Sequence, residues 1–130
     1  FTFYGSTLHA YTYLNERYGN DYDMEKIRIA NIDIEVGSED GFPEPEQANQ
    51  PITAITIKMK NKLYVMGTNN YQNDRDDVYY INCKSEHNLV DVFLKTWKKL
   101  DPDIVTGWNI RFFDIPYLVN RITKIFGDYK

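Results

Sequence analysis

Two acidic residues, Asp33 and Glu35, alternate with aliphatic ones in the sequence Ile-Asp-Ile-Glu-Val. Side chains two positions apart in a strand point to the same face, so both carboxylates would share one face and the aliphatic side chains the other. Two like charges this close repel, and burying either is costly unless it is paired or bound to a metal. A cation that bridges both carboxylates is one interpretation of the pair. The other is a strand end or sheet edge where water solvates both acids.

A third carboxylate, Asp114, lies in the sequence Asn-x3-Phe-Asp-x-Pro-Tyr, which begins at Asn109. Phosphodiester cleavage by two metals needs carboxylates that converge on cations about 3.5–4 Å apart, and Mg²⁺ prefers oxygen ligands. Asp33, Glu35 and Asp114 could supply such a cluster. Asp114 is also a good candidate for a helix N-cap, because Pro116 follows in the first turn of an expected helix. The two roles are compatible, since a capping residue can also face a site.

The neighbours of Asp114 admit two interpretations each. The Asn109 side chain could bind a loop backbone or face a ligand, and Phe112 and Phe113 could be core residues or stack on a nucleobase. Cys83 has no histidine near it in the sequence, which favours a small residue at a strand end over a nucleophile. The remaining basic candidates lack a ligand pattern and are predicted to lie on the surface: His9, His87, Lys95, Lys98 and Lys99.

These residues need a sheet to position them. Apolar residues of both parities predict a central strand over 27–36, covered on both faces, and the two carboxylates mark where one face opens. A proline-containing loop over 37–51 follows, and then two strands over 51–59 and 63–66 that pair as a hairpin around a turn at Asn61-Lys62. Residues 67–77 are polar and acidic, typical of an exposed, mobile loop, and a short strand is expected over 78–81. Weak alternation over 8–14 suggests one more strand.

Two amphipathic helices complete the expected fold. Ser85 is a predicted N-cap, and apolar residues recur at helical spacing up to Leu100 before Asp101-Pro102 ends that helix. A short strand over 103–107 leads to a second helix that opens at Asp114 and stops at Gly127. We therefore predict an α/β protein, with a mixed sheet and helices packed on it.

Composition limits the class of protein. A chain of 130 residues with 42% apolar and 15% aromatic residues is long enough for one domain with a core. Its net charge of -4 argues against a protein that only coats phosphates, whereas an enzyme that holds cations between acids and phosphates need not be basic. A single cysteine fits a reducing, cytoplasmic setting, and the sequence has neither a membrane-spanning run nor a signal peptide. A start at Phe1 and a stop just after a helix predict a piece of a longer protein.

The two carboxylate motifs resemble those of a known family. The sequence Asp33-Ile34-Glu35 resembles the first exonuclease motif of family B DNA polymerases, and residues 107–117, Gly-Trp-Asn-Ile-Arg-Phe-Phe-Asp-Ile-Pro-Tyr, resemble the second. The second motif is specific, whereas the first alone is weak. The chain is more similar still to the replicative polymerases of T-even-like phages, through residues 42–45, 52–56, 120–121 and 126–127. The resemblance covers most of residues 11–130.

The resemblance implies a 3′→5′ proofreading exonuclease with a ribonuclease H-like (DnaQ-type) fold, truncated at its C-terminal end. It implies two divalent metal ions, Mg²⁺ or Mn²⁺. Asp33 would be shared between both metals, Glu35 would hold one and orient water, and Asp114 would support the second. Asn109 and Phe113 would contact the frayed single-stranded 3′ end of the primer. The parent enzyme would act on primer-template DNA with a sliding clamp and other replisome proteins, in the infected host cytoplasm if phage-encoded, and not at a membrane.

Two departures from this family matter. The family has a third motif, Tyr-x3-Asp, on a later helix, and residues 1–130 contain no such sequence. The stretch between Met66 and Ser85 is also shorter than expected for the phage enzymes. We therefore expect residues 1–26 to be the end of the polymerase N-terminal domain and 27–130 an incomplete exonuclease domain with little activity of its own. The alternatives are a non-catalytic nucleic-acid-binding module or a structural fragment of the same fold.

Overall fold

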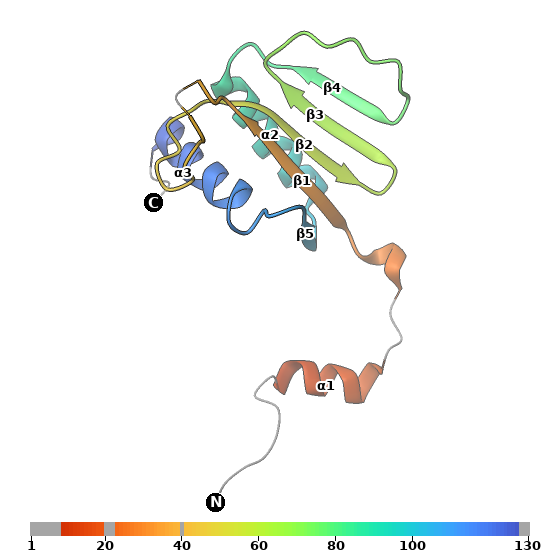
Figure 1. Cartoon of the computed structure of the whole chain (residues 1–130). Coiled ribbons are helices and arrows are strands. Elements are labelled where there is room, and N and C mark those ends of the chain that lie inside the picture. Colours follow the sequence, from red (N-terminus) through yellow and green to blue (C-terminus); the bar gives the residue numbers. More distant parts are fainter. Residues whose placement is uncertain (1–8, 20–22, 40, 128–130) are drawn as a thin grey trace, which may run out of the picture.

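The computed structural model describes residues 9–19, 23–39 and 41–127, and a mixed five-stranded sheet forms its centre (Figure 1). The strands lie in the order β4-β3-β2-β1-β5. The pairs β1–β2 and β2–β3 are antiparallel, and the pairs β3–β4 and β1–β5 are parallel. The strand bounds are β1 Ile29–Val36, β2 Ile52–Met59, β3 Lys62–Gly67, β4 Val78–Asn82 and β5 Ile104–Thr106. The predicted α/β fold with a mixed sheet is confirmed, and it is consistent with a ribonuclease H-like fold.

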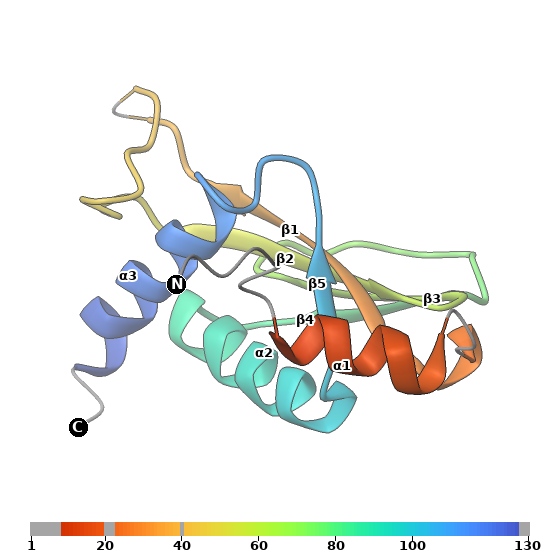
Figure 2. The same ribbon diagram turned by 90° about the horizontal axis from the view of Figure 1, so that it is seen from below.

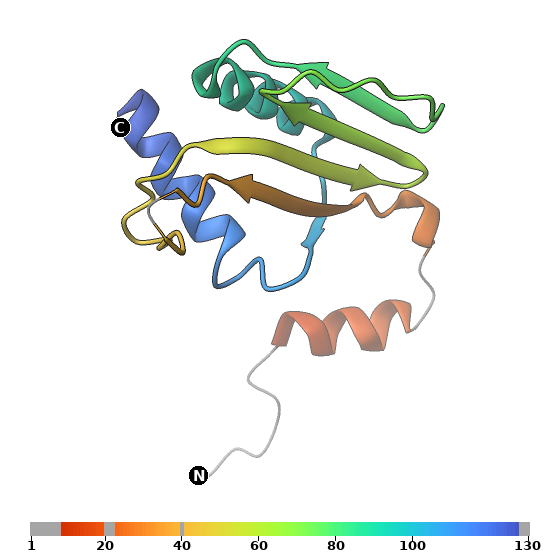
Figure 3. The same cartoon turned by 45° about the horizontal axis from the view of Figure 1, so that its top comes forward.

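Helices α2 (Glu86–Leu100) and α3 (Asp114–Phe126) cover the same face of this sheet (Figures 2 and 3). Ser85 caps α2, because its side chain accepts a hydrogen bond from the amide of Asn88, and the α3 helix ends at Gly127. Both boundaries were predicted. No helix in the described ranges is long and apolar enough to cross a membrane. The buried core lies between the sheet and the two helices, and its larger members are Ile32, Ile34, Ile55, Ile57, Met66, Leu89, Val90, Phe93, Tyr117 and Leu118.

β1 alternates strictly between buried and exposed side chains. Ala30, Ile32 and Ile34 are buried, and the residues between them are exposed. The predicted central position of β1, between β2 and β5, and the predicted opening of one face at the carboxylates are confirmed, whereas cover of both faces is wrong along most of the described strand. The apolar residues of the other parity, Ile27 and Ile29, lie at the start of the strand and are only half-buried. One face of the sheet remains open, and the acidic residues of β1 lie on it.

The hairpin of β2 and β3 was predicted, with its turn displaced by one residue. Met59 pairs with Lys62, so Lys60 and Asn61 form the turn. Lys60 has a φ of 53°, in the left-handed region that a tight turn requires. Residues 68–77 then connect β3 to the parallel strand β4, and most of them are exposed, as predicted.

The expected strand over 8–14 is wrong where the structure describes it. Residues His9–Tyr18 form helix α1, which has no buried residue and stands away from the sheet in Figure 1. A helix satisfies its own backbone hydrogen bonds, whereas a strand needs a neighbouring strand to do so. Leu8 lies outside the described residues. A single turn of 3-10 helix, Met24–Lys26, leads into β1 and is capped by the Asp23 side chain.

Candidate active site

The two carboxylates of β1 lie together on the open face of the sheet. Asp33 is directly opposite Thr56 of β2, and Glu35 is opposite Ala54. Directly opposite residues share a face, so the cross-strand neighbours of the two acids on β2 have small side chains. Both acids are exposed. They are therefore accessible to a ligand and to water, which is the arrangement that the alternation of Ile-Asp-Ile-Glu-Val predicts.

Asp114 reaches the same strand from the far end of the sequence. It is the first residue of α3, its side chain is only 4% exposed, and its Oδ1 accepts a hydrogen bond of 3.1 Å from the backbone amide of Ile34. Ile34 lies between Asp33 and Glu35 in β1. This hydrogen bond therefore holds the third carboxylate, that of Asp114, against the strand that carries the other two.

This contact corrects the predicted capping role of Asp114. The N-cap of α3 is Phe113, and no side chain caps this helix. β5 pairs with β1 only as far as Asn31, so beyond that residue the edge of β1 has no strand beside it. The Asp114 carboxylate takes the place of the missing strand at Ile34. The sequence could not show this, because it does not show where β5 ends relative to β1.

A close backbone crossing brings α3 to this position. A Cβ atom placed on Gly107 would lie 2.5 Å from the carbonyl oxygen of Ile32 and 2.4 Å from a methyl group of Ile110. Glycine therefore lets the chain that leaves β5 pass directly against β1. Residues 107–113 make this crossing, and Asp114 follows at its end.

Burial is the main influence on the charge of Asp114. It raises the pKa of this carboxyl above its ordinary value, and the negative charge of Asp33 raises the pKa further, whereas the amide of Ile34 acts in the opposite direction. Asp33 is thus close enough to Asp114 for the two charges to interact. A cation bound at this place would relieve both the repulsion and the cost of burial.

The donor set fits a hard divalent cation, because it consists of carboxylate oxygens. Two of the three groups, Asp33 and Glu35, are exposed and can approach a ligand, and Asp114 is fixed by its hydrogen bond. In the described ranges, however, no three acidic, histidine or cysteine side chains are arranged so that they could hold a metal ion as they stand. The structure places the three predicted ligands around one segment of β1 but does not form a finished metal cage.

Asn109 and Phe113, the predicted substrate contacts, lie on the segment that crosses β1. Asn109 has a φ of 54°, and its carbonyl oxygen accepts hydrogen bonds from the amides of Phe112 and Phe113. Its backbone therefore shapes the turn, whereas its side chain is exposed. Phe113 is half-buried and packs on Tyr117, and Phe112 is 73% exposed. Between the two rings, Phe113 is the one that the core holds in place.

Phe42 is a further candidate that the residue patterns did not single out. It lies in the loop after β1, is 83% exposed, and its ring centroid is 5.7 Å from that of Phe113. Two tilted rings at this distance form a stable aromatic pair. The sequence carried one signal for Phe42, a large aromatic residue in a polar, proline-containing loop, but it did not connect this loop with Phe113.

Comparisons with known proteins show which proteins this chain resembles. The sequence profile of the family described as "DNA polymerase family B, exonuclease domain" matches residues 8–129. The DNA-directed DNA polymerase of Escherichia phage RB69 is 38% identical over 145 aligned positions, and that of Enterobacteria phage T4 is 32% identical over 145; each alignment covers 89% of this chain. The DNA polymerase delta catalytic subunit of Plasmodium falciparum is 31% identical over 118 positions, which cover 82% of the chain.

The chain spans 16% of the length of each phage polymerase and 10% of the Plasmodium subunit. The alignments with the phage enzymes are longer than the matched part of this chain, so these relatives contain insertions relative to it. The predicted shortening between Met66 and Ser85 stays a prediction, because the aligned lengths do not place the insertions.

Proposed function

The chain belongs to the exonuclease-domain family of the family B DNA polymerases, and we propose on this premise that it forms part of a 3′→5′ proofreading exonuclease. Residues 27–130 would be the exonuclease portion, and residues 1–26 the end of a preceding N-terminal domain. The observation that carries the proposal is the hydrogen bond from Ile34 to Asp114, which brings the two distant carboxylate motifs together.

The substrate of the proposed reaction is the single-stranded 3′ end of a DNA primer, and the product is a deoxynucleoside monophosphate. Asp33, Glu35 and Asp114 would hold two divalent ions, Mg²⁺ or Mn²⁺, with Asp33 shared between them. When bound, the ions would supply a hydroxide from water and would stabilise charge on the leaving oxygen. The exposure of Asp33 and Glu35 supports this role, because ions that keep several waters need an open site.

The chain's own residues would orient the reactants. Glu35, on the open face, would position the attacking water by accepting its hydrogen bond. Phe113, held by Tyr117, and Phe42 beside it offer aromatic rings on which the last bases can stack. The exposed Asn109 side chain can donate and accept hydrogen bonds to the same strand end. Selection for a frayed end would follow, because paired bases cannot reach these rings.

The parent protein would also polymerise DNA on a primer-template and would bind a sliding clamp and other replisome proteins. The phage relatives are named DNA-directed DNA polymerases as whole proteins, and the matched region is 16% of their length. The proposed polymerisation and binding would depend on parts of the protein other than the 130 residues described by this sequence.

A single-stranded oligonucleotide labelled near its 3′ end tests the proposal, with Mg²⁺ or Mn²⁺ added. We expect metal-dependent binding and only slow shortening by this chain, because its sequence contains no Tyr-x3-Asp motif to supply a fourth carboxylate. Asp33→Ala should abolish the slow reaction. Asp76→Ala, in the exposed 68–77 connection, is the matched control and should leave it unchanged. Rapid shortening that Asp33→Ala does not affect would refute the site.

A further inference from the structure

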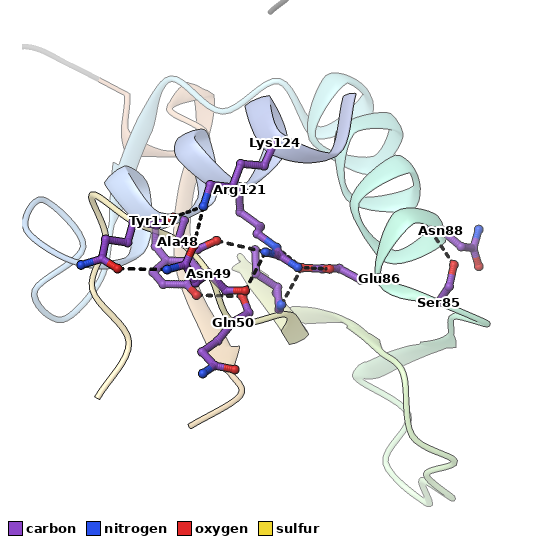
Figure 4. Close-up of polar contacts among 11 residues, drawn as sticks. Ala48, Asn49, Gln50, Ser85, Glu86, Asn88, Tyr117, Arg121 and Lys124 are labelled. Atoms are coloured by element: carbon purple, nitrogen blue, oxygen red, sulfur yellow. Dashed lines mark hydrogen bonds and ion pairs between the residues drawn. The ribbon is translucent and has the colours of Figure 1, made fainter. Parts of the chain in front are cut away.

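One side of α3 binds the loop that separates the β1 carboxylates from β2. Tyr117, Asn120, Arg121 and Lys124 have the spacing i, i+3, i+4 and i+7, which places them on one face of the helix. Figure 4 shows three of these side chains directed at the loop residues Ala48, Asn49 and Gln50. The helix that begins with Asp114 is therefore also the support of this loop.

The contacts from this helix face go mainly to backbone carbonyl oxygens. Tyr117 donates to Gln50 (2.8 Å), Asn120 to Pro45 (2.8 Å), and Lys124 to the carbonyl oxygen of Gln47 and the side chain of Asn49. Arg121 donates to the carbonyl oxygens of Ala48 (3.0 Å) and Asn49 (2.9 Å). Because most of these bonds are made to backbone carbonyl oxygens, they fix the path of the loop largely independently of the loop side chains.

Arg121 is in turn held by Glu86 at the start of α2. The guanidinium donates two hydrogen bonds of 2.7 Å to the two carboxylate oxygens, and both side chains are less than one fifth exposed. Glu86 also accepts a hydrogen bond of 2.7 Å from the amide of Ile52, the first residue of β2. A fork of this geometry is specific to arginine, since lysine cannot make two parallel bonds and two carbonyl contacts at once.

The loop conformation depends on this support. Ala48 is fully buried and has a φ of 41°, in the left-handed region that alanine rarely adopts. Such a conformation persists only where the surroundings hold it. The loop ends are closed by the bond from Gly37 to the carbonyl oxygen of Pro51 (2.9 Å), so a change at Ala48 must be absorbed within the loop. Phe42 lies in the same loop and packs on Phe113.

We propose that Arg121 and Glu86 are positioning residues of the candidate site: through the backbone of residues 45–50 they hold Phe42 beside Phe113, where the 3′-terminal base of a single strand stacks. The inference rests on the proposed function for the identity of the ligand. The Arg121–Glu86 ion pair contacts none of the three site carboxylates, and we do not expect it to contact the bound DNA. The ion pair would change the affinity for the 3′ end of the DNA and would leave metal binding by the carboxylates unchanged.

Two measurements test the proposal, and the first does not involve DNA. Hydrogen exchange of residues 41–51, followed by mass spectrometry, reports the loop directly. Arg121→Gln should accelerate exchange there by about tenfold, while the central strand β2 stays protected. Arg121→Lys should restore little of the protection, because it keeps the charge and loses the fork. Lys95→Gln, which breaks the exposed pair with Asp91, is the control and should change nothing in the loop.

The second measurement uses single-stranded DNA with a 3′-terminal 2-aminopurine, whose fluorescence falls when the base stacks. In Mg²⁺, Arg121→Gln and Phe42→Ala should each weaken the binding of this strand by about tenfold. The double variant should be no weaker than Phe42→Ala alone, because Arg121 acts through Phe42. A merely structural ion pair would instead give additive losses. If Arg121→Gln does not fold, Asn120→Ala removes one loop contact and tests the same coupling.

The possible outcomes separate this inference from the proposed function. Unchanged loop exchange in Arg121→Gln would overturn the inference, whatever the chain binds. Accelerated exchange with additive effects on the 2-aminopurine signal would overturn it as well. A wild-type chain that protects the loop but gives no 2-aminopurine response would overturn the stacking role of Phe42, and with it the ligand assignment of the proposed function. Accelerated exchange of the loop in Arg121→Gln, together with non-additive losses of DNA affinity, would support the positioning role of Arg121 and Glu86.

Discussion

At Asp114, burial and the Ile34 amide act on one carboxylate in opposite directions. Burial raises its pKa, so the folded chain holds the proton more tightly than the unfolded chain. The free energy of unfolding therefore falls as the pH rises from the ordinary carboxyl pKa through the raised one. Asp114→Asn removes this titration and keeps an oxygen that can accept from Ile34. We expect the variant to be more stable than wild type at pH 7, with an advantage that shrinks towards pH 3.

Urea unfolding of both proteins at several pH values measures this difference. Other groups titrate in both proteins, so the difference isolates position 114. A variant that becomes less stable relative to wild type as the pH rises from 3 to 7 would show that the charged carboxylate is favourable in the fold. Such a result would exclude the view that Asp114 is kept for a ligand at a cost in stability.

The exposed acids Asp33 and Glu35 should matter for metal binding and little for folding. Asp33→Ala or Glu35→Ala should weaken Mn²⁺ binding at least about tenfold, by analogy with the loss of residues that only support ligands. The melting temperature without metal should barely change, because surface substitutions alter stability by less than about 0.5 kcal/mol. Calorimetric titration with Mn²⁺ measures the first effect. Equal binding by both variants and by the Asp76→Ala control would place the metal elsewhere.

The residue types could be predicted from the sequence, but their contacts only in part. Alternation placed Asp33 and Glu35 on one face, because strand geometry leaves no other choice. The bond between Asp114 and Ile34 depends on where β5 stops, and the pairing of Phe42 with Phe113 depends on the path of a loop. Both are tertiary facts without a local signal. The resemblance connected the two motifs by precedent, not by geometry.

Among the elements, the crossing from β5 to α3 leaves the least room for a larger side chain. Gly107→Ala would place a methyl group 2.5 Å from the carbonyl oxygen of Ile32. That oxygen belongs to a central strand and cannot move freely, so we expect a loss of about 1–3 kcal/mol in the free energy of unfolding. The displaced crossing should also weaken Mn²⁺ binding, because Asp114 lies at its end.

Gly37→Ala is the matched control for this crossing. Its added Cβ would lie 3.4 Å from Pro51, an ordinary contact, so we expect a much smaller loss of stability. Denaturant unfolding and metal titration of both variants measure the contrast. Equal losses from the two substitutions would show that glycine at 107 is not required for a close approach.

At its beginning, β5 is joined to β1 by an ion pair. Arg28 donates side-chain hydrogen bonds of 2.8 Å to both Asp101 and Asp103. The bonds to Asp103 from the Arg28 guanidinium and then from its backbone amide lower the pKa of Asp103 to about 2. A depressed pKa contributes stability above the ordinary carboxyl value, and this contribution is lost as the pH falls from about 4 through about 2. Arg28→Gln should therefore reduce the loss of stability between pH 4 and pH 2.

Acid unfolding of Arg28→Gln and wild type tests this expectation, and high salt should diminish the difference because all three side chains are substantially exposed. Lys95→Gln again serves as the control. Parallel acid transitions in wild type and Arg28→Gln would mean that the pair adds no stability at the start of β5.

Helices and strands with a regular apolar spacing could be predicted from the sequence. A segment that packs on no other element, such as α1, could not. The apolar spacing of α2 and the hairpin of β2 and β3 followed from the sequence because each buries a defined face. α1 was predicted as a strand from weak alternation, yet it pairs with none of the five strands of the sheet, and a helix needs no such partner for its backbone hydrogen bonds. The same reasoning explains the open face of β1, since its second apolar set ends before the acids.

On the scale of the whole molecule, the open sheet face and the net charge of -4 set the conditions for binding DNA. Asp33 and Glu35 are exposed on this face, and Asp114 lies at its edge, so a phosphate that approaches without a cation meets repulsion. A divalent ion reverses the sign of the local charge. Affinity for single strands should therefore depend on the metal and not on a basic surface.

Asp33→Ala should therefore affect DNA binding differently with and without the metal. In Mg²⁺, Asp33→Ala should weaken the binding of a short single strand, because a ligand of the bridging cation is lost. In EDTA, where wild type should hardly bind, the same substitution should leave binding unchanged or slightly stronger, because it removes a repulsive charge. Fluorescence anisotropy measures both affinities. A non-catalytic nucleic-acid-binding module would instead bind in EDTA, with a steep salt dependence from released counterions, and Asp33→Ala would have the same effect under both conditions.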